Sequence, residues 1–290
     1  MPLVTAQGIS RLVIPLLRRS VVLPNTVARV PGDEYTGPNG GTITLRVRQP
    51  RSASTQENPG DEITYTSIDE DDVDVSVIHI YDGVQLTDQE LSLELVSFAT
   101  QVSAPQVASV ATGIEDELAA AMNDVTADAT DVSDSNVDDY ILEAREVLGQ
   151  NNVPMGDRFC AVSPAAATLV LGLDNFERNL PASGDASALR EAIIGRYRGF
   201  TFVESNGLTG GDEDVSLVFY HRSGFAFTQR APVPPRGAAQ SASVSDSGFG
   251  LRQIFDYDAD HATDRSLLSS FAGASVVDED RVFKVEDATT

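Results

Sequence analysis

The sequence predicts an α+β fold, in which strand-rich segments precede and follow a block of helices. Three observations lead to this class. Two alternating strands come before a long helix with one apolar stripe, and a strand–helix unit lies in the middle of the chain. Strand patterns rich in aromatic residues then return in the C-terminal part. The 290 residues are enough to bury a sizeable core in one or two domains.

The first 36 residues contain a short helical candidate, followed by an extended tail that Pro24 and Pro31 interrupt. Such an arm has little to fold against by itself, so we expect it to lie on a neighbouring subunit or on the rest of the chain. Its most apolar stretch, residues 12–17, contains a proline and is too short to span a bilayer. We therefore expect no membrane partner.

Residues 37–85 are predicted to be β-structure with a long polar interruption. Apolar residues alternate with threonine and arginine over 42–48, and valine alternates with aspartate and serine over 72–77. The segment between these strands is polar and rich in turn residues, especially over 50–61. The two strands therefore form a long hairpin. Because a two-stranded hairpin is only marginally stable alone, it needs a partner surface, which favours an assembly.

Two helices are predicted to follow the hairpin. The first begins at a capping-box pattern over 87–90, where a threonine precedes a glutamate by three residues. The second runs from about Ser103 to Asn123 and is roughly 30 Å long at a rise of about 1.5 Å per residue. Its apolar stripe consists of Val107, Val110, Ile114, Leu118 and Met122. A single long helix beside an extended hairpin is unusual for a compact enzyme.

The middle of the chain is predicted to contain a boundary and then a strand–helix unit. Residues 126–139 are acidic and polar, and a helix follows over 138–148 with Gly149 at its end. A strand over 159–162 leads into Ser163-Pro164, a pair that suits the cap and first turn of a helix. A second helix is predicted from Asp185 as its N-cap, with Leu189, Ile193 and Ile194 at helical spacing and Gly195 at its end.

The strands predicted for the rest of the chain cover residues 200–204, 215–221, 225–229, 251–256, 274–277 and 281–285. The formal charge of −24 argues against a protein that grips nucleic-acid phosphates. The chain has one lysine, Lys284, and one cysteine, Cys160, which lies in an apolar run. An intrachain disulfide is therefore impossible, and we expect Cys160 to be buried.

No catalytic, cofactor or metal site is predicted. The histidines, His79, His221 and His261, do not lie at metal-ligand spacing, and residues 134–145 lack the glycine and final glutamate of a calcium-binding EF-hand loop. The position of the only lysine excludes a phosphate-binding P-loop. The sequence also lacks the G-x-S-x-G pattern of many hydrolases. We therefore expect a protein without enzymatic activity.

Charged residues of the hairpin are candidates for contacts between subunits. Three arginines, Arg46, Arg48 and Arg51, crowd its first strand, either as a solvated edge or as partners for carboxylates of a neighbour. The acidic run of the second strand includes Glu70, Asp71 and Asp72. It forms a solvated face or pairs with arginines of another subunit, and loose binding of a divalent ion is the weaker alternative.

The segment 157–208, DRFCAVSPAAATLVLGLDNFERNLPASGDASALREAIIGRYRGFTFVESNGL, resembles the A domain of tailed-phage major capsid proteins of the HK97 fold. Residues 81–87 (YDGVQLT) and 255–258 (FDYD) are similar to that family too. The resemblance implies five parts: an N-terminal arm (1–36), an E-loop hairpin (37–72), a P domain with the spine helix (73–134), an A domain (135–212), and P-domain strands with a C-terminal return (213–290).

The resemblance further implies a coat protein of the virion, made in the host cytoplasm. Its copies assemble as hexamers and pentamers into an icosahedral head around double-stranded DNA, which they do not bind sequence-specifically. Some relatives carry a long N-terminal scaffolding domain, whereas the arm of this chain begins within the first residues. The resemblance therefore implies a separate scaffolding protein. A portal and a decoration protein are further implied partners. Some relatives crosslink through an E-loop lysine, which residues 37–85 lack.

Two alternatives remain open at this point. An encapsulin-like compartment shares the fold but encloses a cargo enzyme, and DNA inside the particle distinguishes the two. A β-rich binding or adhesion module belongs to another class, which a particle of shell size excludes.

Overall fold

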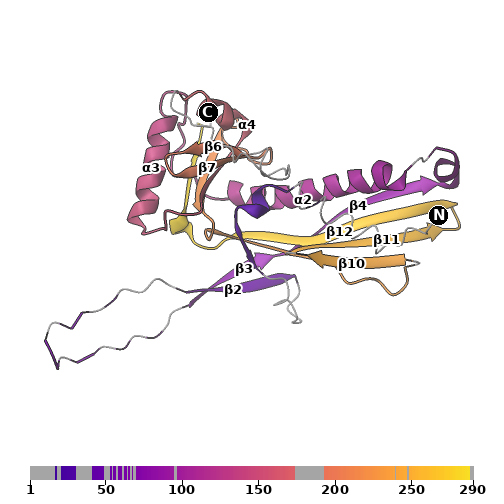
Figure 1. Cartoon of the computed structure of the whole chain (residues 1–290), viewed down its shortest axis with the longest axis horizontal. Coiled ribbons are helices and arrows are strands. Elements are labelled where there is room, and N and C mark those ends of the chain that lie inside the picture. Colours follow the sequence, from indigo (N-terminus) through magenta and orange to yellow (C-terminus); the bar gives the residue numbers. More distant parts are fainter. Residues whose placement is uncertain are drawn as a thin grey trace.

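A long helix, α2 (Ala104–Asn123), lies along one face of a twisted β-sheet in the computed structural model (Figure 1). Pro105 occupies its first turn, where a missing N–H leaves no hydrogen bond unmade. The five predicted stripe residues are all buried, which confirms both the helix and its orientation. The structure describes Leu17, residues 21–30, 41–48, individual positions between 53 and 67, and residues 70–94, 97–173, 193–238, 240–246 and 248–287.

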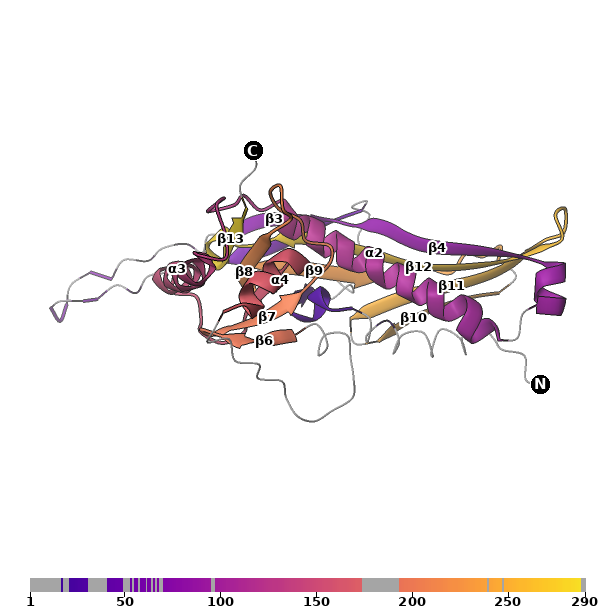
Figure 2. The same ribbon diagram turned by 90° about the horizontal axis from the view of Figure 1, so that it is seen from above.

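The sheet beneath α2 is built around one strand, β12 (Thr263–Val276). At one end β12 pairs antiparallel with both β4 (Ile78–Thr87) and β11 (Phe249–Asp258), and at the other end with β9 (Phe225–Arg230). Two shorter strands complete the sheet: β10 (Gln240–Asp246) beside β11, and β1 (Ala28–Val30) parallel to β9. Figure 2 shows β4, β12, β11 and β10 running along the length of the helix.

Three of these strands were either not predicted from the sequence or are longer than predicted. β10 and most of β12 were not predicted, because serine and glycine at many of their positions weaken the alternation of apolar and polar residues. β4 lies in the predicted β-structure of residues 37–85 and extends two residues beyond it. Pairing with neighbouring strands on both sides makes β12 a strand despite its small residues.

The first hydrophobic core lies between α2 and the long sheet and includes the arm residues Leu17, Val21, Leu23 and Val27. Polar side chains join the helix to the sheet within it. Gln106 of α2 donates to the Ser266 carbonyl oxygen at 3.0 Å and accepts from the Ser266 hydroxyl at 2.9 Å. Gln253 of β11 donates to the same hydroxyl at 2.8 Å. These directional bonds fix the position of α2 along the strands.

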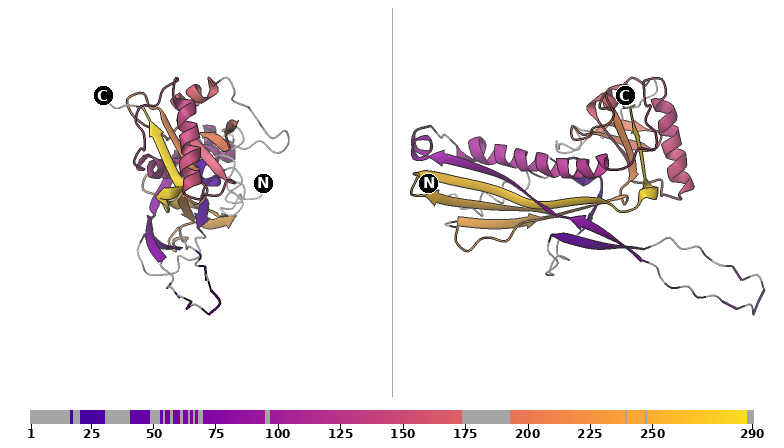
Figure 3. Two further views of the ribbon diagram at one scale, coloured as in Figure 1. Left: turned by 90° about the vertical axis from the view of Figure 1, so that its left-hand side faces the viewer. Right: turned by 180° about the vertical axis from the view of Figure 1, so that it is seen from behind.

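A second lobe carries its own sheet and core (Figure 3). Its strand order is β13–β8–β5–β7–β6, in which β5 and β7 are parallel and the other pairs are antiparallel. The strand bounds are β5 (Arg158–Val162), β6 (Ile193–Tyr197), β7 (Phe200–Glu204), β8 (Ser216–His221) and β13 (Val282–Glu286). The division of the chain into five domains stays a prediction, and β8 and β13 pair within this second sheet.

Helices α3 (Val137–Gln150) and α4 (Pro164–Leu171) belong to the same lobe. The predicted cap of α4 is confirmed, because the Ser163 hydroxyl accepts from the Ala166 amide at 3.2 Å. α3 continues through Gly149 and ends one residue later than that glycine. The helix therefore ends two residues, about half a turn, after the predicted last residue at 148.

The predicted helix ending at Gly195 is wrong where the structure describes it. Ile193 and Ile194 lie in strand β6, which pairs with β7 across a two-residue turn. That turn places both Arg198 (φ 48°) and Gly199 (φ 99°) in the left-handed region, as a type I′ hairpin requires. The β-branched pair therefore favours the strand once a hairpin partner is present, whereas Asp185 and Leu189 lie outside the described residues.

Lys284 joins the two lobes. Its buried ammonium group lies 3.0 Å from the Glu286 carboxylate and donates to the carbonyl oxygen of Asn123, the last residue of α2, at 2.8 Å. The Asn123 side chain in turn donates to the Gly207 carbonyl oxygen and accepts from the Thr209 amide. A cation at a helix C-terminus is favourable, because the last carbonyl groups carry partial negative charge. The only lysine of the chain therefore has a structural position.

The predicted hairpin is confirmed as β2 (Thr42–Arg48) paired with β3 (Glu70–Ser76), and it projects away from both lobes (Figure 1). Ile43 and Val75 form a small buried cluster with Ala226 at its base. The predicted capping box is confirmed too, since the Thr87 amide and hydroxyl both donate to the Glu90 carboxylate. The remaining short helical segments are Leu23–Asn25, Glu90–Glu94, Ala99–Ser103 and Glu279–Arg281.

Candidate assembly surfaces

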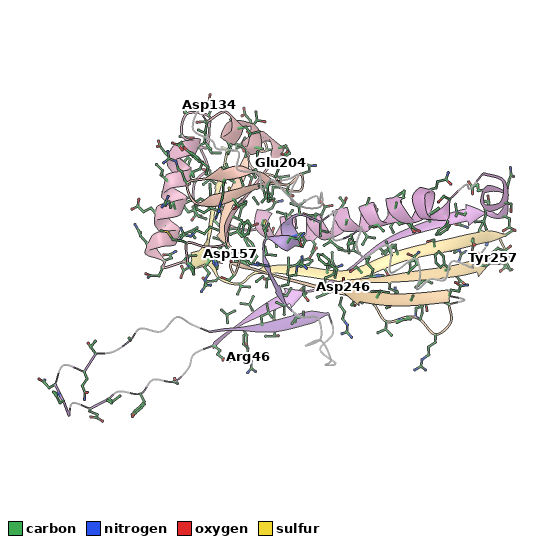
Figure 4. The ribbon with its side chains drawn as sticks, in the orientation of Figure 1. Arg46, Asp134, Asp157, Glu204, Asp246 and Tyr257 are labelled. Atoms are coloured by element: carbon green, nitrogen blue, oxygen red, sulfur yellow. The ribbon has the colours of Figure 1, made fainter. Side chains whose placement is uncertain are left out.

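The hairpin presents opposite charges across its two strands. The register places Arg46 opposite Asp72 and Arg48 opposite Glu70. The Arg46 guanidinium lies 3.8 Å from the Asp72 carboxylate and 4.0 Å from the Glu70 carboxylate, and its side chain is 74% exposed. Figure 4 shows Arg46 pointing away from the ribbon of the hairpin. Exposed pairs at these distances are worth about 0–1 kcal/mol.

The structure thus brings together Arg46, Glu70 and Asp72 of the predicted contact residues, within one chain. Arg51 and the side chains of Arg48 and Asp71 lie outside the described residues. Whether any of these groups meets a neighbouring subunit stays a prediction.

Large apolar side chains are exposed on the hairpin and near its base. Ile63 and Tyr65, beyond the paired strands, are 61% and 89% exposed. Val233, Ile78 and Tyr81 are exposed on or beside the long sheet, and Val233 lines an apolar pocket with Val77 and Phe271. Exposed apolar surface on a projecting element is typical of protein–protein contacts.

The N-terminal arm is held against α2 and the long sheet. The Thr26 and Tyr220 hydroxyl groups form a buried hydrogen bond of 2.5 Å. The Arg29 guanidinium lies over the Phe249 ring at 4.0 Å from its centroid, and its Nε donates to the Pro24 carbonyl oxygen. The arm segment 21–30 therefore lies on the rest of its own chain, one of the two expected placements.

Glu115 of α2 is a second anchor of the arm. Its carboxylate accepts hydrogen bonds from the backbone amides of Val22 and Leu23, just where the short helical turn begins. Glu115 was not among the contact residues predicted from the sequence. Helical spacing gives a signal for it, because Ala111, Leu118 and Ala119, at i−4, i+3 and i+4, are all buried.

The groups that carry chemistry in enzymes are held in structural positions. Burial raises the pKa of the Cys160 thiol, which disfavours the nucleophilic thiolate. The His79 ring stacks on Tyr81 and lies tilted against Phe271. Its pKa is lowered by burial and, to a smaller extent, by the positive charge of nearby Arg252. Within the described ranges, no three His, Cys, Asp or Glu side chains lie together as a metal site, and no helix is long and apolar enough to cross a membrane.

The hairpin and the arm that packs along α2 are the candidate surfaces for contact between subunits. Residues 100–288 match the model of a family described as phage capsid protein, so the chain belongs to that family. It is a major capsid protein, and its place is the capsid of a virion. No match was found among curated proteins.

Solved structures share the fold over nearly the whole chain, and this fold is HK97-like. A structure from Mycobacterium phage Che8 is 21% identical, with a TM-score of 0.61, covering 91% of this chain and 90% of that one. The capsid of Ralstonia phage GP4 is 9% identical, with a TM-score of 0.63 and coverage of 91% and 87%. A virus-like particle from Pyrococcus furiosus is 9% identical, with a TM-score of 0.55 and coverage of 97% and 98%.

Proposed function

We propose that this major capsid protein assembles as hexamers and pentamers into the icosahedral head of a tailed virus, around double-stranded DNA. The observation that carries the proposal is the projecting hairpin, whose paired strands bury only a small cluster at its base. Its exposed Ile63 and Tyr65 gain an apolar environment only against another molecule. Copies of the same chain, packed in a closed shell, supply that surface at every position.

The acidity of the chain suits a container for DNA. A formal charge of −24 disfavours tight contact with phosphates, so the packaged DNA is held without sequence-specific binding and stays free to leave. The proposed setting is synthesis in the host cytoplasm, with a separate scaffolding protein, a portal and a decoration protein as further partners. As a coat subunit, the protein has no enzymatic activity of its own.

The content of particles purified from infected cells tests this function against the encapsulin-like alternative. We expect double-stranded DNA that resists nuclease until the particles are disrupted. Particles that hold a cargo enzyme and no DNA would contradict the proposal and favour the compartment shell. Empty particles made by expression of this chain alone serve as the control for adhering nucleic acid.

We further propose that the hairpin charges, Arg46, Arg48, Arg51, Glu70, Asp71 and Asp72, contact neighbouring subunits. Arg46 already lies beside two carboxylates of its own chain, Glu70 and Asp72. A carboxylate of a neighbouring subunit therefore competes with these two for the Arg46 guanidinium. Each exposed pair contributes only about 0–1 kcal/mol, but a shell repeats the contact at every interface. Reversal of all three arginines to glutamate is expected to lower the melting temperature of the shell.

A charge exchange separates contacts within the chain from contacts between chains. Arg46→Asp combined with Asp72→Arg restores an opposite-charge pair across the same register position. If a neighbour uses these charges, the exchanged shell melts below the wild type, as the single variant Arg46→Asp does. If the exchange fully restores the wild-type melting temperature, Arg46 pairs only within its own hairpin, and the proposed contact with a neighbour is wrong.

A further inference from the structure

The arm contact at Glu115 places an ionisable carboxyl group beneath the N-terminal arm. Both carboxylate oxygens face backbone amides of the arm, at Val22 and Leu23. Around this contact, the side chains of Val21, Leu23 and Val27 are completely buried in the core that α2 also lines. The arm thus covers the carboxylate, and release of the arm returns that carboxylate to water.

The charged surroundings of Glu115 do not supply a compensating cation within the described residues. Asp116 follows it on the same helix and repels its negative charge, and half-buried Glu117 is the next acidic group. From the sheet side, the neighbouring titratable group is the Tyr220 hydroxyl, whose pKa burial raises. Arg18 and Arg19 precede the contact in the sequence but lie outside the described residues.

We propose that Glu115 is a protonation-dependent latch, which holds the N-terminal arm on the spine helix α2 more tightly when its carboxyl group is neutral. The arm amides favour the carboxylate through hydrogen bonds, whereas the apolar cover disfavours any charge. The balance between them decides the direction of the pH dependence.

The balance favours the neutral form at the docked arm. Burial raises the pKa of the Glu115 carboxyl from 4.5 to about 7, the two amides lower it, and Asp116 raises it slightly. A group that binds its proton more tightly in the docked state stabilises that state at low pH. The stabilisation is complete below the pKa of the released carboxyl, near 4.5, and is lost as the pH rises to about 7. Docking therefore weakens about tenfold per pH unit across this window and is constant above it.

Hydrogen exchange of the full-length protein between pH 5 and pH 8.5 tests the latch. The measured quantity is the opening equilibrium of the arm peptide around residues 21–30, after correction for the intrinsic pH dependence of amide exchange. We expect this equilibrium to shift toward opening by about tenfold per pH unit up to about pH 7 and then to level off. A wild-type opening equilibrium that does not change with pH would overturn the proposal.

Two variants separate the latch from general effects of charge. Glu115→Gln is uncharged at every pH, so its arm is expected to stay closed and independent of pH. Glu117→Gln removes the same charge two residues along the helix and is expected to keep the wild-type profile. The proposal fails if Glu115→Gln follows the wild-type profile. If that variant does not fold, Asp116→Asn provides the test. Removal of this negative neighbour lowers the pKa of Glu115, so the pH at which the opening equilibrium levels off must become lower. An unchanged levelling-off pH would contradict the proposal.

Discussion

Leu118→Asp is expected to yield insoluble or unassembled protein. Leu118 belongs to the stripe by which α2 packs on the long sheet, and its side chain is completely buried. Loss of a buried leucine costs about 2–5 kcal/mol, and an unpaired buried carboxylate adds several more. The sum is comparable to the entire stability of an ordinary domain, which is about 5–15 kcal/mol.

The matched control for this variant is Ala120→Asp. Ala120 lies on the exposed face of the same helix, two residues away, so it receives the same charge without burying it. We expect soluble protein with a melting temperature close to that of the wild type. Soluble and assembled Leu118→Asp protein, measured by sedimentation, would show that α2 does not pack through this face.

Deletion of residues 51–61 is expected to abolish shell formation while both lobes stay folded. The deleted segment connects β2 to β3 in the sequence, and none of its described residues belongs to either lobe core. The folded state is measured by thermal unfolding in circular dichroism, where the transition should match the wild type. Assembly is measured separately by gel filtration, where the variant should elute as free subunits or small oligomers.

A variant in which a Gly/Ser segment of equal length replaces residues 51–61 is the control, because it keeps the length of the hairpin and removes its side chains at these positions. If that variant assembles, the hairpin needs its length rather than its own side chains at these positions. Closed shells of normal diameter from the deletion itself would contradict the role of the hairpin in assembly.

The sequence predicts those elements well whose residues fix their own conformation. The α2 stripe, the hairpin strands and the Ser163-Pro164 cap follow from local spacing and capping chemistry, and all are present. The hairpin arginines were found by their charge, and Arg46 indeed faces carboxylates, although these belong to its own second strand.

Other features depend on pairing between distant residues, which local patterns do not contain. β12 is a strand because β4, β9 and β11 surround it, and Ile193 and Ile194 belong to a strand because β7 pairs with them. The arm anchor at Glu115 joins residues more than 90 positions apart. Helical spacing predicts that Glu115 lies beside the core, but only the fold shows which backbone amides it meets.

Electron cryomicroscopy of the purified assembly tests the central claim most directly. We expect closed icosahedral particles in which α2 and the long sheet form the wall, with this chain at both the six-fold and five-fold positions. In the cryomicroscopy map of these particles, we expect each hairpin to contact a neighbouring subunit. A preparation of well-folded protein that stays monomeric, or that forms only open oligomers in which the hairpin touches no neighbour, would contradict it.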